Sequence, residues 1–424
     1  MRSRFSRGLW AHPDFVRLWA GTTTSTFGSL IGYIALSFTA IEFLNATAAQ
    51  VAILGACQLV PGFLVSPVAG VWVDRLSRRP ILIVSDIGRA AALFTVPLAA
   101  GAGVLGMWQL YAVSVVTSML SVFFQAAYQS YLPTLVTRDE LLEGNARLSA
   151  TASVAEVGSF GISGWLVQLL KAPGAVAIDA TSFVVSAYFI WRIRQPEPPV
   201  ERDTDTEHFW REARDGAGLV VRNPILRAMA LAECLSATSE RTITTVFLLY
   251  LNQELGFEAG VLGLIFAVGG VTSLGGAYLA NRGTLFFGGV GRTLAVSSFM
   301  RATGMLFMPL CAGNNALGIA FLVANQVVTD PFWALWEIHD VSLKQASVPE
   351  RMQGRLFANF RLISFGFALV GTALGGVLGA TIGFRATLFV GVGLMYGAAA
   401  VLAFSPLAKV RQASDASIEL AGAS

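Results

Sequence analysis

Charged residues stand in the middle of several long apolar runs of this sequence. Glu240 and Arg241 lie together within one run, and Asp330 lies within another. A carboxylate removed from water favours its neutral form, so such an acid can take up a proton and release it as its access to water changes. Glu240 and Asp330 are therefore candidate proton carriers. Four further residues are candidates for proton coupling or substrate binding: Arg241, Glu233, Glu156 and Arg301.

A purely structural role is the alternative for these charges. A charge inside a membrane costs about 2.5–3.5 kcal/mol on scales of helix insertion, and such residues commonly pair with one another. Glu156 with Arg301, or Arg241 with Asp330, would form a static pair of this kind. The sequence by itself leaves both roles open.

The composition identifies the elements that must hold these charges. Of 424 residues, 54% are hydrophobic and 13% are charged, whereas soluble proteins carry about 25% charged residues. Too few polar side chains are present to cover a water-soluble surface, which excludes a large cytosolic enzyme and a disordered chain. A polytopic membrane protein fits, because helices satisfy every backbone polar group internally. The net charge of +3 argues against a nucleic-acid partner.

Twelve runs of roughly 20 mostly apolar residues predict twelve transmembrane helices. The predicted spans are 18–44, 49–74, 80–101, 107–133, 143–170, 174–192, 225–251, 256–280, 292–311, 315–338, 357–380 and 384–405. The predicted fold is an all-α polytopic membrane protein of two pseudo-symmetric six-helix bundles. Its parts are an N-terminal bundle (1–192), a cytoplasmic linker (193–222), a C-terminal bundle (223–408) and a cytoplasmic tail (409–424).

A weak internal repeat supports the division into two halves. Glu140 and Gly144 recur as Glu350 and Gly354, 210 positions later. A parallel repeat of six spans is a transporter architecture, with substrate bound between the halves near the middle of the bilayer. Basic residues fall almost entirely in the loops on one side, so the positive-inside rule predicts cytoplasmic N- and C-termini.

The loop between the second and third spans has the most specific motif. It contains Gly70, Asp74, Arg75, Arg78 and Arg79, with three residues between the glycine and the acid. The glycine permits close helix approach, and the acid can pair with arginines or face a helix N-terminus. Such a cluster can lock one side of a two-state protein shut and release it, so we expect these five residues to form a gate. A merely solvated basic loop is the alternative.

This motif resembles the loop that follows the second helix in the major facilitator superfamily. Other segments resemble the branch that contains macrolide and siderophore exporters, among them Leu132 to Val136, Asp179 to Phe183 and Gln345 to Arg355. The chain has Trp72 and Ser77 where the family pattern has a smaller aliphatic residue and glycine. The resemblance implies a facilitator fold, secondary active transport and a cytoplasmic-membrane location.

In that superfamily helices 1, 4, 7 and 10 line the transport path, and the corresponding spans here carry polar stripes at helical spacing. Helix-to-helix hydrogen bonding is the alternative role for their hydroxyl groups. Spans three, six and twelve are largely apolar and are expected to face lipid. The residues predicted to line the cavity are Thr26, Tyr33, Gln125, Gln129, Trp333 and Glu337.

These features predict an exporter of a hydrophobic or amphipathic small molecule, such as a drug, siderophore or secondary metabolite, driven by protons. The chain lacks a P-loop, a nucleophile elbow and metal-ligand spacing, so we expect no enzyme activity, metal or cofactor. Expected partners are the substrate, protons and membrane lipids, with the protein a monomer. The alternatives are a non-transporting sensor or scaffold, an importer, and a lysolipid flippase. Substrate identity, direction, stoichiometry and the acid that carries the proton are not readable from sequence.

Overall fold

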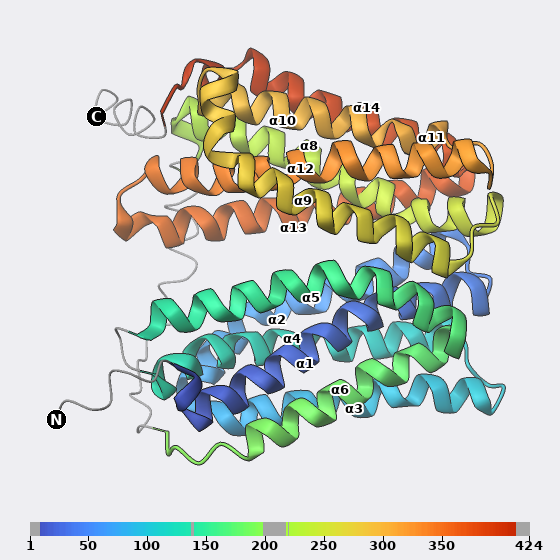
Figure 1. Cartoon of the computed structure of the whole chain (residues 1–424), viewed down its shortest axis with the longest axis vertical. Helices are drawn as coiled ribbons and strands as arrows, with labels where there is room; N and C mark the ends of the chain where they lie inside the picture. The colour runs from blue at the N-terminus through green and yellow to red at the C-terminus, as the bar shows by residue number, and fades with distance from the viewer. Residues whose placement is uncertain (1–8, 137–139, 198–217, 219, 413–424) are drawn as a thin grey trace. The chain divides into compact units, whose positions relative to one another are not determined.

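Long helices form almost all of the chain that the structure describes. The computed structural model describes residues 9–136, 140–197, 218 and 220–412, apart from the side chains of some residues within helices (Figure 1). The first half contains α1 (Pro13–Phe38), α2 (Ala48–Arg75), α3 (Arg78–Gly101), α4 (Met107–Leu135), α5 (Leu141–Leu170) and α6 (Ala172–Trp191). The second half contains α8 (Pro224–Leu249), α9 (Ala259–Phe287), α10 (Val290–Met305), the short α11 (Phe307–Leu310), α12 (Ala316–Ala346), α13 (Glu350–Thr381) and α14 (Phe384–Phe404).

The length and hydropathy of these helices suit a membrane. Within the described residues, nine helices are long and apolar enough to cross one. The prediction of an all-α polytopic membrane protein is therefore confirmed. Each predicted span overlaps a helix, while the count of twelve crossings stays a prediction. Three boundaries differ by seven or eight residues: α9 continues to Phe287, past 280, α12 continues to Ala346, past 338, and α13 begins at Glu350, before 357.

Contacts divide the chain into two compact units. The first unit lies within residues 1–46, 54–206 and 258–264, and the second within 47–53, 207–257 and 265–424. In the first unit α6 packs against α1 and α3, and α3 also packs against α4. In the second unit α8 packs against α13 and α14, while α10 packs against α12 and α14. Each unit thus has its own helical core.

The first helix of each half follows the same plan. α1 begins at Pro13 and α8 at Pro224, which are 211 positions apart. Proline suits the first turn of a helix, where an N–H group would have no partner within the helix. Both helices continue into a π-helical turn, Thr39–Phe43 and Tyr250–Glu254, again 211 positions apart. The backbone therefore repeats with a constant register through the first helix of each half.

The turns that follow these helices repeat as well. Asn45 has a φ of 52°, and Gly256, which follows it by 211 positions, has a φ of 70°. Asparagine and glycine are the residues that adopt this left-handed backbone most readily. The next helices begin at Ala48 and Ala259, in the same register. The internal repeat is thus visible in the turns as well as in the helices.

Close helix packing in the second unit depends on glycines at GxxxG spacing. A Cβ atom added at Gly371 of α13 would lie 2.4 Å from the carbonyl oxygen of Thr238 in α8. One added at Gly375 would lie 2.9 Å from the carbonyl oxygen of Thr242. The Thr242 hydroxyl donates a hydrogen bond of 3.1 Å to the carbonyl of Gly371. The two backbones therefore approach as small residues permit in membrane helices.

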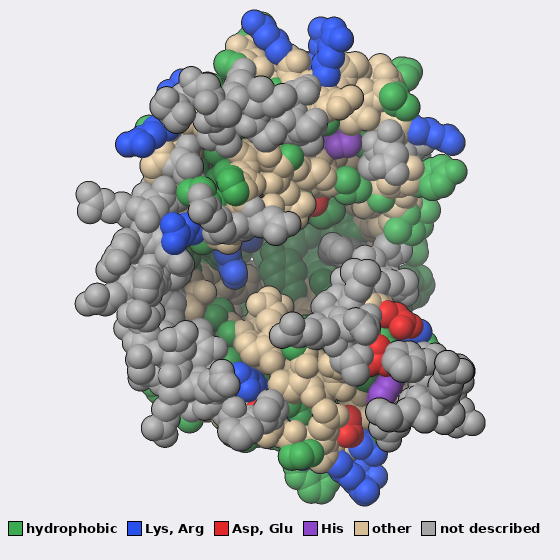
Figure 2. Space-filling view, turned by 90° about the vertical axis from the view of Figure 1, so that its left-hand side faces the viewer, with side chains coloured by type: hydrophobic (Ala, Val, Ile, Leu, Met, Phe, Trp, Pro, Cys, Tyr) green, Lys and Arg blue, Asp and Glu red, His purple; other side chains and the backbone are tan. Residues whose placement is uncertain are grey.

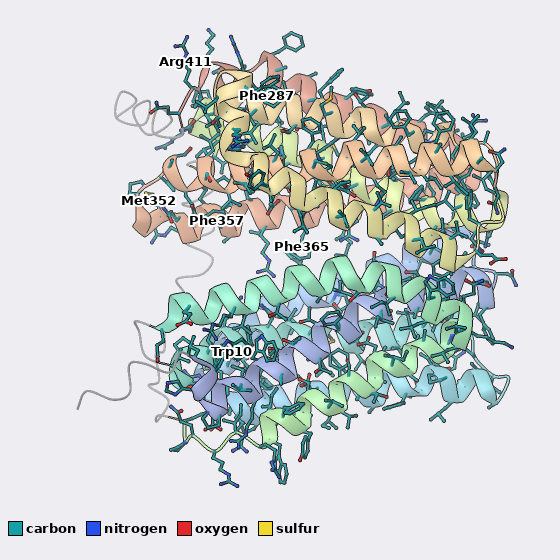
Figure 3. The ribbon with its side chains drawn as sticks, in the orientation of Figure 1. Trp10, Phe287, Met352, Phe357, Phe365 and Arg411 are labelled. Atoms are coloured by element: carbon teal, nitrogen blue, oxygen red, sulfur yellow. The ribbon has the colours of Figure 1, made fainter. Side chains whose placement is uncertain are left out.

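The last described residues run back to the beginning of α10. The backbone N–H of Val290 donates to the carbonyl of Arg411, a residue labelled in Figure 3, at 3.1 Å. The N–H of Gly291 donates to the carbonyl of Val410 at 3.0 Å. These two amides belong to the first turn of α10, which has no partner for them within the helix. The segment after α14 thus caps α10.

Candidate functional site

A buried arginine and a partly exposed glutamate form an ion pair in the second unit. Arg301 lies in α10 and its side chain is 1% exposed, whereas Glu240 in α8 is 42% exposed. An Nη2–H group of Arg301 donates to Oε1 of Glu240. Both residues were predicted as candidates, but the predicted static pair joined Arg301 to Glu156, whose side chain lies outside the described residues. In the structure the partner of Arg301 is Glu240.

The guanidinium of Arg301 also meets an aromatic ring and retains free donors. Its Cζ atom lies 5.0 Å from the centre of the Trp336 ring, which α12 contributes. Within the described part of the chain, its Nε and Nη1 atoms have no hydrogen-bond partner. Arginine carries five N–H donors, so most of the capacity of this one is unused. We call Glu240, Arg301 and Trp336 the Arg301 cluster.

More acids lie near this cluster on α12. Glu337 is within electrostatic range of Glu233, Glu240 and Arg301. Asp340, three positions further along α12, binds the ammonium group of Lys344 at 2.5 Å. Sequence analysis missed this last pair because the predicted span ended at 338. The i,i+4 spacing of an acid and a lysine was the signal that could have found it.

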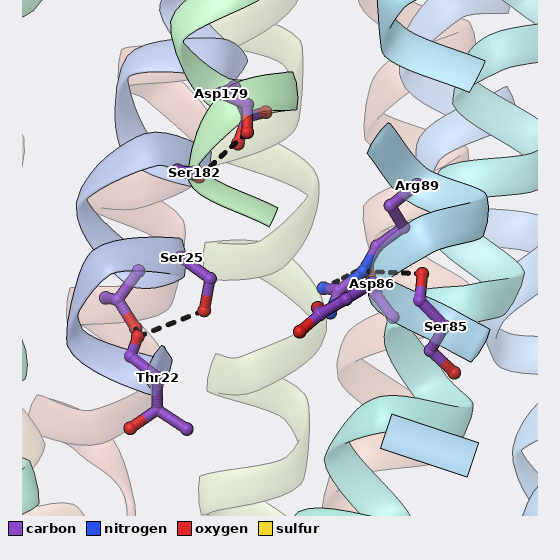
Figure 4. Close-up of polar contacts among 9 residues, drawn as sticks. Thr22, Ser25, Ser85, Asp86, Arg89, Asp179 and Ser182 are labelled. Carbon is purple, nitrogen blue, oxygen red and sulfur yellow. Dashed lines mark hydrogen bonds and ion pairs between the residues drawn. The ribbon is translucent and has the colours of Figure 1, made fainter. Parts of the chain in front are cut away.

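The first unit buries a second arginine that sequence analysis missed. Arg89 and Asp86, both on α3, form an ion pair with side chains 7% and 0% exposed (Figure 4). The Arg89 Cζ atom lies 4.4 Å from the ring centre of Phe124 in α4 and 4.1 Å from that of Phe183 in α6. We call these four residues the Arg89 cluster. A guanidinium held between two rings is stabilised by cation–π attraction in addition to its ion pair.

The two arginines are equivalent in the internal repeat. Arg89 stands 11 positions after the first residue of α3, and Arg301 stands 11 positions after the first residue of α10. The rings of Phe124 and Trp336, which contact these arginines, are 212 positions apart, as are the arginines themselves. Among the described residues, these are the arginines whose side chains are buried. The repeat register was the sequence signal that could have revealed Arg89.

Asp179 of α6 lies beside the Arg89 cluster and is nearly completely buried. Its side chain is 5% exposed and acts electrostatically on Arg89. A Cβ atom added at Gly32 of α1 would lie 2.0 Å from Asp179 Oδ2, and one added at Gly28 would lie 1.9 Å from Ser182 Oγ. Two glycines of α1 therefore make room for Asp179 and Ser182 of α6, the two α6 side chains labelled in Figure 4.

Spans three and six are expected to face lipid, and in addition to such a face each helix has an opposite side that buries one or more charged residues. α3 exposes Val84 and Leu98, which are 65% and 71% exposed, as a lipid-facing surface would. Its opposite side buries Asp86 and Arg89, and α6 buries Asp179. Mean hydropathy did not reveal these faces, because the two buried charged residues of α3 and the one of α6 change the average of a long apolar helix only slightly.

The remaining predicted acids and bases have individual positions. Asp330 of α12 crowds Gly269 of α9, where an added Cβ atom would lie 2.0 Å from Asp330 Oδ2 and 2.3 Å from the side-chain nitrogen of Gln326. Glu233 and Arg241, both on α8, are half-buried. The structure thus brings Glu233, Glu240 and Arg301 near Glu337, while Asp330 lies on a different contact, against α9.

The predicted cavity residues are mostly exposed. Thr26 is half-buried, and its hydroxyl donates to the carbonyl of Thr22 at 2.8 Å, one turn earlier in the same helix, so this bond does not join two helices. Tyr33 and Trp333 are 45% and 40% exposed. The other three predicted cavity residues, all in the exposed class, are Gln125, Gln129 and Glu337.

Two of the predicted gate residues tie α3 to the end of α6. The Arg79 guanidinium donates to the carbonyl oxygens of Ile190, at 3.2 Å, and Trp191. In return the Glu197 carboxylate accepts the backbone N–H groups of Arg78 at 2.7 Å and Arg79 at 2.8 Å. An acid at a helix N-terminus and a base at a helix C-terminus both complement the helix dipole. Glu197 is a member of this network that sequence analysis missed.

The other three gate residues lie where the structure gives no side-chain description. They are Gly70, Asp74 and Arg75, at the end of α2. The pairing of Asp74 with arginines therefore stays a prediction, because the Asp74 side chain is not among those described. Within the part of the chain that is described, no group of three His, Cys, Asp or Glu side chains is arranged to hold a metal ion.

Taken together, these contacts place acids next to arginines in the interior of both units. In the second unit, Glu240 binds the buried guanidinium of Arg301, which has further donors free within the described part of the chain. An acid whose charge state controls a buried cation can couple proton binding to a change of helix contacts.

Comparison with known proteins agrees with a transport role. The sequence profile of the Major Facilitator Superfamily matches residues 18–333. Macrolide efflux protein A of Streptococcus pyogenes is 24% identical over 324 residues, covering 72% of this chain and 78% of that protein. The multidrug efflux pump Tap of Mycolicibacterium fortuitum is 22% identical and covers 88% of this chain and 91% of its own length.

A solved structure shares the fold. The inward-facing structure of a bacterial homologue of the iron transporter ferroportin superposes with a TM-score of 0.72. The match covers 93% of this chain and 98% of the other at 17% sequence identity. At that identity the likeness shows the arrangement of helices and does not identify a substrate.

Proposed function

The chain belongs to the major facilitator superfamily, and on that premise we propose that it exports a hydrophobic or amphipathic small molecule in exchange for protons. It is a multi-pass membrane protein of a transporter family. The observation that carries the proton-coupled mechanism is the ion pair between the buried Arg301 and the partly exposed Glu240. Alternating access moves the substrate, and this pair senses the proton.

The difference in exposure within the pair supports this role. Glu240 is 42% exposed, so water can deliver a proton to it, whereas Arg301 at 1% cannot reach water in this conformation. Breaking a buried ion pair is strongly unfavourable because it leaves an uncompensated charge. Protonation of Glu240 therefore favours a conformation in which Arg301 finds other acceptors, and Glu337 is an acid within electrostatic range of Arg301. Asp330, on the contact with α9, is the proposed second proton carrier.

The substrate class rests on the relatives and on exposed aromatic side chains. Two relatives have names that state efflux, of macrolides and of multiple drugs. Tyr33 and Trp333 offer flat apolar surfaces with a polar edge, which suit amphipathic ligands. We propose that the six predicted cavity residues, including both glutamines of α4, contact the substrate.

The gate, the membrane orientation and the domain division belong to the same proposal. Gly70, Asp74, Arg75, Arg78 and Arg79 form the cytoplasmic gate. We propose the same domain division as the sequence predicts. Its parts are the bundles 1–192 and 223–408, the linker 193–222 between them and the tail 409–424. The protein acts as a monomer among membrane lipids.

Cytoplasmic termini are supported by the distribution of exposed basic side chains. Figure 2 shows Lys and Arg side chains on the face that carries the beginning of α10 and the end of α14. In the second unit, the exposed basic residues at this end include Arg292, Lys409 and Arg411, and Arg385 lies at the opposite helix ends. In the first unit, the exposed Arg192 and Arg194 follow the end of α6, and Lys171 precedes its beginning. In each unit, considered by itself, the positive-inside rule favours a cytoplasmic position for the end with more basic residues.

Transport by the reconstituted full-length protein tests the proposal. Vesicles carrying a pH gradient should move a fluorescent amphipathic cation or a macrolide against its concentration gradient. Glu240→Gln and Asp330→Asn should each reduce gradient-driven transport by about tenfold or more, the size expected when a coupling energy of roughly 1.4 kcal/mol is lost. Glu254→Gln, which changes an exposed acid after α8, is the matched control and should transport normally.

Each other outcome identifies a different function. Normal gradient-driven transport in both acid variants would overturn coupling through these residues. Movement in the opposite direction would show an importer, and movement of labelled lysolipid between leaflets would show a flippase. Absence of flux for every probe, with a folded protein, would favour the sensor or scaffold.

A further inference from the structure

Three ionisable side chains meet in the interior of the first unit, and their charges do not balance. Asp86 and Asp179 are 0% and 5% exposed, and Arg89 is 6% exposed. Arg89 binds Oδ1 of Asp86, so one acid has a partner. If both acids were ionised, this interior would hold an uncompensated negative charge, which costs several kcal/mol per ion in a low-dielectric environment.

In the part of the chain that the structure describes, one oxygen of each acid lacks a hydrogen bond of good geometry, although the hydroxyls of Ser186 and Ser182 lie near Asp86 and Asp179. Oδ2 of Asp86 and Oδ1 of Asp179 lack a hydrogen-bond partner among the described residues. Buried carboxylate oxygens in native proteins are nearly always hydrogen-bonded. A proton on one of these acids removes the net charge and turns an orphaned acceptor into a donor group.

Asp179 is the acid that should hold this proton. Asp86 makes a direct ion pair with Arg89, whereas Asp179 interacts with Arg89 only at longer range. Its Oδ2 atom packs against Gly32 of α1, and the polar groups that act on this carboxyl are the distant Arg89 guanidinium and the Ser182 hydroxyl. Neutralising an acid that has no cation in direct contact sacrifices the smallest amount of favourable electrostatic energy.

The charged residues on neighbouring elements do not supply a second cation at this point. α6 packs against α1, α3, α5 and the π-turn η2. The charged side chain that acts on Asp179 is that of Arg89. Those elements also carry Asp14 and Arg17 in α1, Glu42 in η2, Arg78, Arg79 and Asp86 in α3, and Glu143, Arg147 and Glu156 in α5, of which Glu156 lies outside the described side chains.

We propose that Asp179, together with Arg89 and Asp86, forms a proton-binding site in the first unit, separate from the Arg301 cluster. The equivalence of Arg89 and Arg301 in the repeat supports it, because the same buried guanidinium then faces a titratable acid in each half. When Asp179 releases its proton, the Arg89 guanidinium faces two negatively charged carboxylates. The added attraction to Asp179 draws it toward α6. The proton site is inferred from this geometry alone. Its role in transport depends on the proposed function.

Infrared difference spectroscopy of the full-length protein in lipid vesicles tests the site directly. Raising the pH should remove the carbonyl band of a protonated carboxylic acid in the wild-type protein. Asp179→Asn should lose the component of that band that Asp179 contributes, and Glu240→Gln should keep this component. Because Asn can disturb folding, Asp179→Glu serves as a second variant and should shift the component without abolishing it.

The outcomes separate this proposal from the proposed function. A band that is unchanged in both Asp179 variants overturns the site, and a component lost only in Asp86→Asn assigns the proton to Asp86 and overturns the assignment to Asp179. If Asp179→Asn loses its component while gradient-driven transport fails even in wild type, the proton site stands and the exporter proposal falls. If transport is proton-driven while the whole band persists in Asp179→Asn, the reverse holds.

Discussion

Arg301, almost completely buried in α10, is bound by Glu240 of α8, which is partly exposed. We expect Glu240→Gln to lower the free energy of unfolding by about 1.5–3 kcal/mol, the contribution typical of hydrogen bonds to charged groups. Thermal unfolding in detergent measures the change. The double variant Glu240→Gln with Arg301→Met should recover part of the loss, because it removes the uncompensated cation. Equal stability of Glu240→Gln and the wild type would show that the pair contributes nothing.

The contact between α13 and α8 predicts a different effect at two glycines. Gly371→Ala would place Cβ 2.4 Å from the carbonyl oxygen of Thr238, and a backbone atom cannot move aside as a flexible side chain can. We expect a loss of about 1–3 kcal/mol in thermal stability, as for overpacking of a core. Gly366→Ala on the same helix meets nothing within 4 Å and should be neutral or slightly stabilising. Similar melting temperatures for the two variants would contradict this explanation.

The packing of α1 on α6 allows a test by compensation. Gly32→Ala would bring Cβ within 2.0 Å of Asp179 Oδ2, so we expect loss of folded protein or a lower melting temperature. Asp179→Ala in the same chain removes the obstructing carboxylate. The double variant should be more stable than the sum of the two single changes predicts, which a double-mutant cycle measures. Strict additivity would mean that the two positions do not contact.

The carboxylate at the beginning of α3 should protect two backbone amides. Glu197→Ala removes the acceptor for the N–H groups of Arg78 and Arg79. We expect a loss of about 0.5–2 kcal/mol, as for other helix N-caps, and faster hydrogen exchange in the first turn of α3. Hydrogen exchange followed by mass spectrometry measures it, with the exposed Glu254→Ala as the control. Unchanged exchange in α3 would show that Glu197 does not cap the helix.

The fold could be predicted largely from apolar runs, because a membrane helix must be long and apolar regardless of its neighbours. The extension of α12 beyond its predicted end has a physical cause. Asp340 and Lys344 pair with each other, so the helix continues to Ala346 through residues that hydropathy assigns to a loop. Local hydropathy cannot detect charges that cancel one turn apart.

The site could be predicted only in part. Glu240 and Arg301 were identified because each interrupts an apolar run, but their pairing joins α8 to α10, a relation that sequence spacing does not encode. Asp86, Arg89 and Asp179 were missed because their helices expose apolar faces and bury polar ones. Which side of a helix faces protein rather than lipid depends on the tertiary packing.

The constant register of the first helix in each half has a consequence for how the two copies have diverged. Through the matching π-turns, 211 positions apart, Glu233 and Glu240 correspond to Thr22 and Ser29. Conversely, Asp86 corresponds to Ser298, counting from the first residues of α3 and α10. The duplicated scaffold has kept its arginine and moved the acid to another helix. The two halves therefore share one backbone architecture but differ in which helix carries the buried or partly buried acid beside the arginine.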